Sequence, residues 1–114
     1  MNAVFVELPP FARHRQAYLD DDGFRRLQME LMRKPDIGAV IEGTGGLRKM
    51  RFTDSRRQKG KRGGLRIIYF HWRGGGQFWL FTLYDKDEAD DLTTAERKAL
   101  KTMLDAEVAA RRQG

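Results

Sequence analysis

Four basic residues in the middle of the sequence have the types and spacing needed to bind and cleave a phosphodiester. Lys49 and Arg51 are two positions apart, so their side chains share one face if this segment is a β-strand. Arg66 lies at the start of a second apolar segment, and Lys86 follows a third. RNA cleavage without a metal needs a proton acceptor for the 2′-OH, a proton donor for the leaving 5′ oxygen, and cations around the phosphorus. Basic side chains can fill all three roles.

The positive charge of the chain is concentrated around these residues. The 114 residues carry a formal net charge of +6, from 22 Lys and Arg against 16 Asp and Glu. Segment 47–73 holds ten Lys or Arg residues and a single acid, Asp54, whereas segment 85–96 holds six acids and one base, Lys86. A block of one sign repels itself unless a polyanion neutralises it. This distribution favours a nucleic acid as partner.

Further basic residues near the four are candidates for contacts with RNA phosphates. They are Arg48, Arg56, Arg57, Lys59, Lys61 and Arg62. Five of the six lie in the polar, glycine-rich segment 55–64, which we expect to be a mobile hairpin loop. A solvated loop would carry similar charges, but their density here favours contacts with successive phosphates.

The composition argues against metal, cofactor and membrane chemistry. The chain has no cysteine, and its two histidines, His14 and His71, are far apart in sequence, so we expect no metal site. The glycine turn at 43–46 lacks the Gly-Lys-Ser/Thr of a phosphate-binding loop, so we expect no nucleotide cofactor. No apolar segment is long enough to span a membrane, and the first residues lack the layout of a secretory signal. We therefore expect a cytoplasmic protein.

Local sequence patterns predict the elements that hold the basic residues in place. Alternating or unbroken apolar residues predict strands at 3–8, 47–52, 65–72 and 77–84, the last two forming a central antiparallel hairpin. Helical spacing predicts one short helix from Pro9 to about residue 18 and a second that follows the acids 20–22 and ends at Lys34. Thr93 and Glu96 form a capping-box pattern that begins a last helix at about 93–111. The prediction is one α+β domain, residues 1–114, in the order β-α-α-β-β-β-α.

This order of elements, together with three motifs, resembles the RelE/ParE superfamily of bacterial toxins, and in particular its HigB-type branch. The motifs are GTGGLRK at 43–49, KGKRGG at 59–64 followed by RIIY at 66–69, and YDKDEADDL at 84–92. They cover the middle half of the chain. The resemblance implies a RelE-like fold, a mostly antiparallel twisted sheet packed by two N-terminal helices and a C-terminal helix.

The same resemblance implies a function. Members of the HigB-type branch are toxins of type II toxin–antitoxin systems, and they are ribosome-dependent endoribonucleases that cut messenger RNA and so inhibit translation. We therefore expect the ribosome and messenger RNA as partners, together with a cognate antitoxin that is HigA-like and carries a helix-turn-helix domain.

The resemblance also assigns roles to individual residues. Lys49 matches a catalytic lysine of the relatives, and Arg51 shares its expected face. Arg66 matches the arginine that stabilises the transition state, where its guanidinium can bind two phosphate oxygens. Lys86 matches a basic position that contacts the scissile phosphate or protonates the leaving group.

An aromatic residue that follows this position in the RelE branch has no counterpart here. The matching position is Leu92. Its role is therefore absent, or it passes to Tyr84 or His71. His71 lies between Phe70 and Trp72, so it is also explained as a packed strand residue.

Simpler explanations exist for the same residues. Lys49 and Arg51 would fit the solvent face of an edge strand, and Arg66 would fit a structural ion pair with an acid at 85, 87 or 88. Two other functions are also compatible with the basic segment. One is a ParE-like inhibitor of DNA gyrase, and the other is a non-catalytic nucleic-acid-binding module.

Overall fold

The computed structural model describes residues 3–53, 64–89 and 91–113. The elements in chain order are β1 (Val4–Glu7), α1 (Pro9–Tyr18), α2 (Asp21–Arg33), β2 (Ala39–Val40), β3 (Arg48–Phe52), β4 (Leu65–Trp72), the 3-10 turn η2 (Arg73–Gly75), β5 (Gln77–Asp85) and α3 (Thr94–Gln113). The predicted α+β class is confirmed. The expected loop at 55–64 falls outside the described residues except for Gly64.

The five strands form one sheet in the order β1-β5-β4-β3-β2. β1 runs parallel to β5, and the other three pairs are antiparallel. β4 and β5 are the central strands, as their unbroken apolar sequences predicted. The short strand β2 was not predicted. It pairs Ala39 with Lys49 and Val40 with Arg48, so β3 is not the edge of the sheet along these residues.

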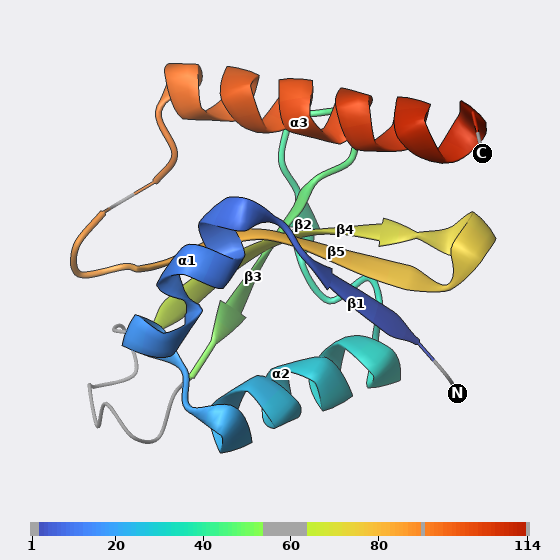
Figure 1. Ribbon diagram of the computed structural model, residues 1–114. Coiled ribbons are helices and arrows are strands. Elements are labelled where there is room, and N and C mark those ends of the chain that lie inside the picture. Colours follow the sequence, from blue (N-terminus) through green and yellow to red (C-terminus); the bar gives the residue numbers. More distant parts are fainter. Residues whose placement is uncertain (1–2, 54–63, 90, 114) are drawn as a thin grey trace.

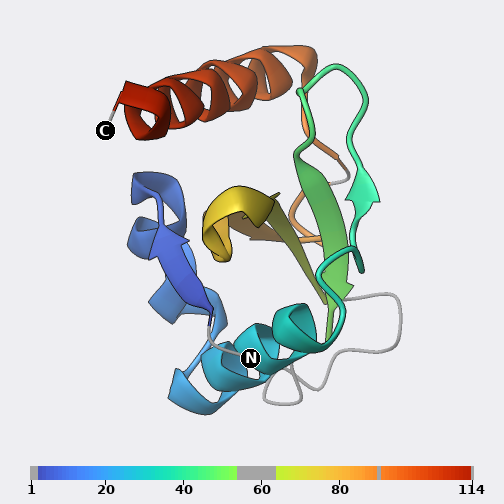
Figure 2. The ribbon, with the colours of Figure 1, turned by 90° about the vertical axis from the view of Figure 1, so that its right-hand side faces the viewer.

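Helices cover both faces of the sheet. α2 lies on one face and α3 on the other, and α1 packs along β5 at the β1 edge of the sheet (Figures 1 and 2). Phe11, Leu27 and Leu31 pack on the first face together with Met50 and Phe52 of β3 and Ile67 of β4. On the second face, Leu100 and Leu104 of α3 pack with Ile68, Trp79 and Phe81. The sheet is therefore apolar on both sides over most of its length.

The predicted helix boundaries rest on capping contacts that the structure contains. The Asp20 carboxylate accepts a hydrogen bond from the Gly23 amide at 2.7 Å and caps α2. The capping box before α3 is complete, because Glu96 accepts from the Thr93 amide at 2.8 Å and the Thr93 hydroxyl accepts from the Glu96 amide at 3.1 Å. This start of α3 fixes the segment 91–96 beside the sheet.

A β-bulge interrupts the pairing of the two central strands. Ile68 pairs with Thr82, but the next residue, Tyr69, pairs with Leu80, so Phe81 has no partner of its own. A bulge shifts the alternation of side chains between the two faces. Phe81 lies in the α3 cluster and Leu83 lies in the opposite one, and Tyr84 packs against the α3 cluster.

Candidate active site

Three side chains form a row across the central strands on the face that α3 covers. Arg51 of β3 is paired with Arg66 of β4, and Arg66 is paired with Tyr84 of β5. Directly paired residues of an antiparallel sheet have their side chains on the same face. Lys49 lies on this face too, two residues from Arg51 and paired with Ile68. The sheet therefore brings together three of the four predicted catalytic residues.

Arg66 is the most unusual member of this row because it is a buried charge. Its exposed fraction is 8%, and its guanidinium donates a hydrogen bond to the Leu65 carbonyl at 3.3 Å. In the described part of the chain, Arg66 forms no salt bridge, so the ion pair considered as its structural role is not found there. Burying an unpaired charge is costly, and an anionic ligand would remove that cost.

Lys49 is held by an acid that sequence reasoning missed. Its ammonium lies 3.2 Å from Oδ1 of Asp91, and Nη2 of Arg97 lies 3.4 Å from Oδ2 of the same carboxylate. The Leu92 amide donates to Oδ1 at 2.7 Å. This amide, and after it Lys49, keep the pKa of the Asp91 carboxyl below its usual range. One sequence feature could have indicated this contact. Asp91 belongs to the acidic segment that leads into the capping box, and that cap holds the end of the segment close to β3.

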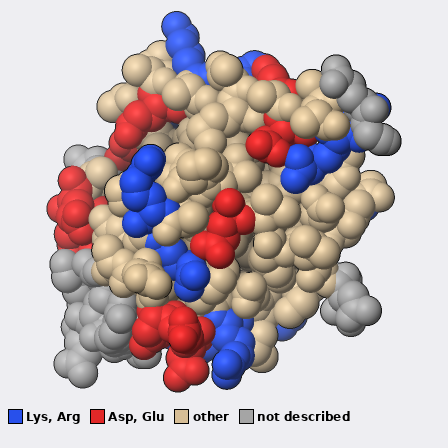
Figure 3. Space-filling model, in the orientation of Figure 1, with Lys and Arg blue, Asp and Glu red and all other residues tan. Residues whose placement is uncertain are grey.

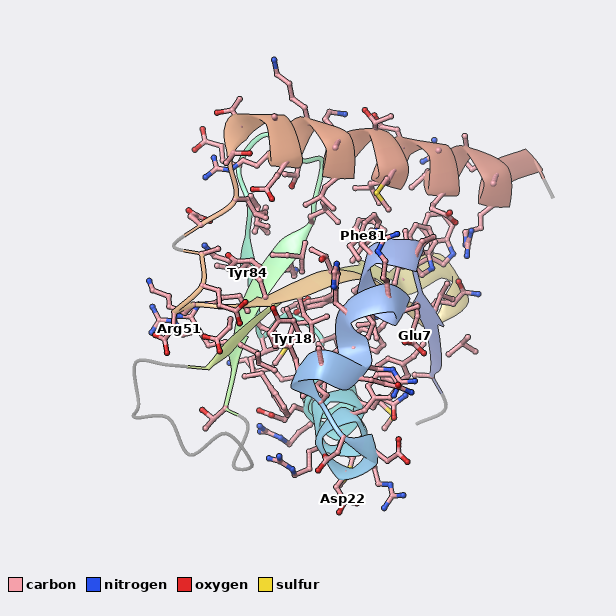
Figure 4. The ribbon with its side chains drawn as sticks, turned by 60° about the vertical axis from the view of Figure 1, so that its left-hand side comes forward. Glu7, Tyr18, Asp22, Arg51, Phe81 and Tyr84 are labelled. Atoms are coloured by element: carbon pink, nitrogen blue, oxygen red, sulfur yellow. The ribbon has the colours of Figure 1, made fainter. Side chains whose placement is uncertain are left out.

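Tyr84 contributes a hydroxyl that is buried and has no hydrogen-bond partner in the described structure. Burial raises the pKa of this hydroxyl, the Asp91 carboxylate raises it further, and Arg66 opposes them. The phenol therefore stays protonated at neutral pH and can act as a hydrogen-bond donor. Figure 4 shows Tyr84 and Arg51 on the same side of the molecule as Tyr18 of α1.

A cavity of about 230 Å³ adjoins this row. Its wall comes from the end of α1, the end of β5, the segment that follows β5 and the first turn of α3. The lining residues are His14, Tyr18, Thr82, Leu83, Tyr84, Ala89, Asp91, Leu92 and Glu96. Tyr84 thus belongs to both the cavity and the row, and Asp91 connects the cavity to Lys49.

Lys86, the fourth predicted catalytic residue, lies just beyond the end of β5. Its amide donates to the Gly64 carbonyl at 3.0 Å, which extends the β4–β5 ladder by one step and places Lys86 near the start of β4. Its side chain is half-buried. Lys86 therefore lies at the same end of the central strands as Arg66.

Two other candidates lie elsewhere. Arg48 is on the opposite face of β3, where its guanidinium donates to the Gly38 carbonyl at 2.7 Å. His71 is near the far end of β4, stacked on Phe78 with ring centroids 4.7 Å apart, and burial lowers the pKa of its imidazole. The site does not include either residue. Of the two possible auxiliary residues, Tyr84 and His71, only Tyr84 lies in the row.

The remaining RNA-binding candidates lie outside the described residues. They are Arg56, Arg57, Lys59, Lys61 and Arg62. Over the described surface, the face in Figure 3 shows Lys and Arg interspersed with Asp and Glu. On this face, the described residues therefore do not form the one-sided positive patch that the charges of segment 47–73 suggest.

The described residues contain neither a metal-binding cluster nor a membrane-spanning helix. No group of three or more His, Cys, Asp or Glu side chains is arranged to hold a metal ion. No described helix combines the length and the apolar character needed to cross a membrane.

Comparison with known proteins identifies the fold. No family model matches the sequence. Among solved structures, the chain is similar to the E. coli toxin RelE, determined as a double arginine-to-alanine mutant in the free state. The TM-score is 0.54 at 14% sequence identity, and the match covers 79% of this chain and 90% of that chain. The RelE-like fold that the sequence resemblance implied is therefore confirmed.

Proposed function

We propose that this chain is the HigB-type toxin of a type II toxin–antitoxin system, a ribosome-dependent endoribonuclease that cuts messenger RNA without a metal. The observation that carries this proposal is the buried Arg66 guanidinium, which pairs with no described acid and lies opposite Arg51. Such a site attracts an anion with more than one oxygen. The RelE-like fold makes a toxin the favoured protein class, and the sequence motifs favour the HigB-type branch.

The proposed reaction is an attack of the 2′-oxygen on the adjacent phosphorus. The new bond joins O2′ to phosphorus, the P–O5′ bond breaks, one proton leaves the 2′-OH, and one proton reaches the 5′ oxygen. Arg66 and Arg51 would hold the non-bridging oxygens as negative charge develops on them. The products are a 2′,3′-cyclic phosphate and a free 5′-OH.

Proton transfer would fall to Lys49, Lys86 and Tyr84. The Lys49 ammonium lies 3.2 Å from the Asp91 carboxylate, a contact that suits a phosphate-binding cation better than a proton acceptor. The protonated Tyr84 phenol and the Lys86 ammonium are both suited to donate a proton to the leaving 5′ oxygen. Lys49 would accept the proton of the 2′-OH only as the neutral amine, after leaving the Asp91 carboxylate and releasing its own proton to water.

The proposed partners follow from the proposed class. Messenger RNA on the ribosome would be the substrate, and the basic residues at 56–62 would bind RNA phosphates. A HigA-like antitoxin with a helix-turn-helix domain would hold the toxin inactive in the cytoplasm.

Ribosome-dependent cleavage is the direct test. Wild type and Arg66→Ala are incubated side by side with translating ribosomes, and new 5′ ends of the message are mapped. We expect the wild type to cut, and Arg66→Ala to lose about 100-fold or more in rate while still binding ribosomes. If neither protein cuts the message and Arg66→Ala weakens RNA binding only by the equivalent of one phosphate contact, the chain is a non-catalytic binder. Intact message together with cleaved DNA would favour a gyrase inhibitor.

A further inference from the structure

The cavity beside the basic row has a lining that does not suit a phosphate. Among its described lining residues there is no Lys or Arg; the ionisable side chains besides tyrosine are His14 and two acids, Asp91 and Glu96. At about 230 Å³ it is smaller than the sites of drug-sized ligands, which span about 300–1,000 Å³. It is therefore suited to a small uncharged group that donates hydrogen bonds.

Two aromatic rings on the cavity wall define the shape of that group. Tyr18 comes from α1 and Tyr84 from β5, and both side chains are half-buried (Figure 4). The Tyr84 hydroxyl is buried and lacks a described hydrogen-bond partner. Aromatic side chains beside hydrogen-bonding groups are the usual means of binding an unstacked nucleobase.

The position of the cavity relates it to the bond that would break. Tyr84 is paired with Arg66, and the Asp91 carboxylate that lines the cavity contacts Lys49 at 3.2 Å. A phosphate bound at Arg66 would therefore have one of its two nucleosides next to the cavity mouth.

From this arrangement we propose that the cavity holds the base of a nucleotide joined by the scissile phosphate, and that it selects bases with amino groups over uracil. The proposal rests on the proposed ribonuclease function and names its base preference. Guanine, adenine and cytosine present amino donors to the Asp91 and Glu96 carboxylates. Uracil presents two carbonyl oxygens beside its single N–H, and these would face the same carboxylates.

Glu96 offers a variant that changes the cavity and keeps the fold. One of its carboxylate oxygens accepts from the Thr93 amide in the capping box, and glutamine serves equally at this position of the motif. Glu96→Gln therefore removes the negative charge and keeps the cap. Glu42→Gln is the matched control, because Glu42 is exposed and lies outside the cavity lining.

The test uses ribosome-bound messages that differ only in the base at the cleavage position. We expect the wild type and Glu42→Gln to cut next to guanine, adenine or cytosine at least about tenfold faster than next to uracil. Glu96→Gln should reduce this ratio several-fold and keep its thermal stability. Equal cleavage next to all four bases, or an unchanged ratio in Glu96→Gln, would overturn the proposed base pocket and leave the nuclease function intact.

A binding measurement separates the pocket from the nuclease function. The 2′-deoxy dinucleotides dApdC and dUpdU, which lack the attacking hydroxyl, are titrated into 15N-labelled wild type. We expect amide shifts at Tyr18, Thr82 and Tyr84 with dApdC at concentrations where dUpdU causes none. If the wild type cuts no message but shows these shifts, the nuclease function fails and the base pocket stands. If neither dinucleotide shifts these amides, the base pocket is wrong.

Discussion

Arg51 and Arg66 lie directly opposite each other in the β3–β4 ladder, with both side chains on the α3 face of the sheet. Like charges at directly paired positions destabilise a sheet. Neither residue forms a salt bridge within the described part of the chain, and Arg66 is nearly inaccessible to water. Within the described residues the pair therefore costs folding free energy, and an anionic ligand would recover it.

Replacing Arg66 by a neutral side chain of similar size should separate stability from activity. We expect Arg66→Met to unfold at the same or a higher urea concentration than wild type, because the substitution removes a buried charge and preserves packing. Its cleavage rate should fall by about 100-fold or more. Arg66→Lys keeps the charge but loses the contact with two phosphate oxygens. Its cleavage rate should therefore lie between those of Arg66→Met and wild type.

Arg25→Met is a suitable control for this experiment. Arg25 lies on α2 in an exposed ion pair with Asp22 at 3.7 Å, away from the row. Its substitution should change neither stability nor cleavage by a measurable amount. If Arg66→Met is instead less stable than wild type, Arg66 has a structural role that the proposed site does not require.

The Tyr84 hydroxyl should matter for the reaction and not for folding. Because this buried hydroxyl has no described partner, Tyr84→Phe removes a polar group that gains nothing on folding. We expect unchanged or slightly increased stability to urea, and a cleavage rate at least about tenfold lower if the phenol donates a proton to the 5′ oxygen. A rate equal to that of wild type would exclude this role. The ring is kept, so the base preference proposed above should persist.

Sequence patterns predicted the helices and four of the five strands in the described residues, but not the short strand β2 and not all of the site. Period-two spacing placed Lys49 and Arg51 on one face, and the unbroken apolar strands placed Arg66 at the centre of the sheet. Asp91 and Arg97 lie 42 and 48 positions after Lys49, and only the docking of α3 on the sheet brings them to its side chain. No local pattern encodes that docking.

The face of the sheet on which Tyr84 lies could not be predicted from the sequence, for a different reason. Alternation carried on from Trp79 and Phe81 would put Leu83 on the α3 face and Tyr84 on the other. The bulge opposite Ile68 and Tyr69 reverses this order, so that Tyr84 faces the basic row. The sequence around Phe81 has no glycine or other residue that marks a bulge.

Stability should depend on pH through Asp91. Its pKa is depressed in the folded protein, so the carboxylate stabilises the fold at neutral pH, and this contribution is lost as the pH falls through the folded pKa, below about pH 4. The Asp91 side chain is 48% exposed, so the contribution is small. We expect Asp91→Asn to be slightly less stable than wild type at pH 7, with a difference that shrinks steadily as the pH is lowered below about 4, measured by urea unfolding. A difference that does not shrink over this range would show that the charge is not its cause.

Among the side-chain hydroxyls of the described residues, that of Tyr69 should contribute most to the free energy of unfolding. Its buried OH accepts from the Gly38 amide at 3.0 Å and donates to the Pro35 carbonyl at 2.7 Å, which fixes the segment between α2 and β2. Tyr69→Phe leaves the buried Gly38 amide and the part-buried Pro35 carbonyl without this partner, so urea unfolding should show a loss of about 1–3 kcal/mol. Tyr84→Phe is the matched control, since it deletes the same atom where no partner exists. Equal effects of the two substitutions would contradict this account. Faster hydrogen exchange in Tyr69→Phe alone at Ile41, whose amide donates to the Leu47 carbonyl at 2.8 Å just after β2, would support it, because β2 depends on this anchor.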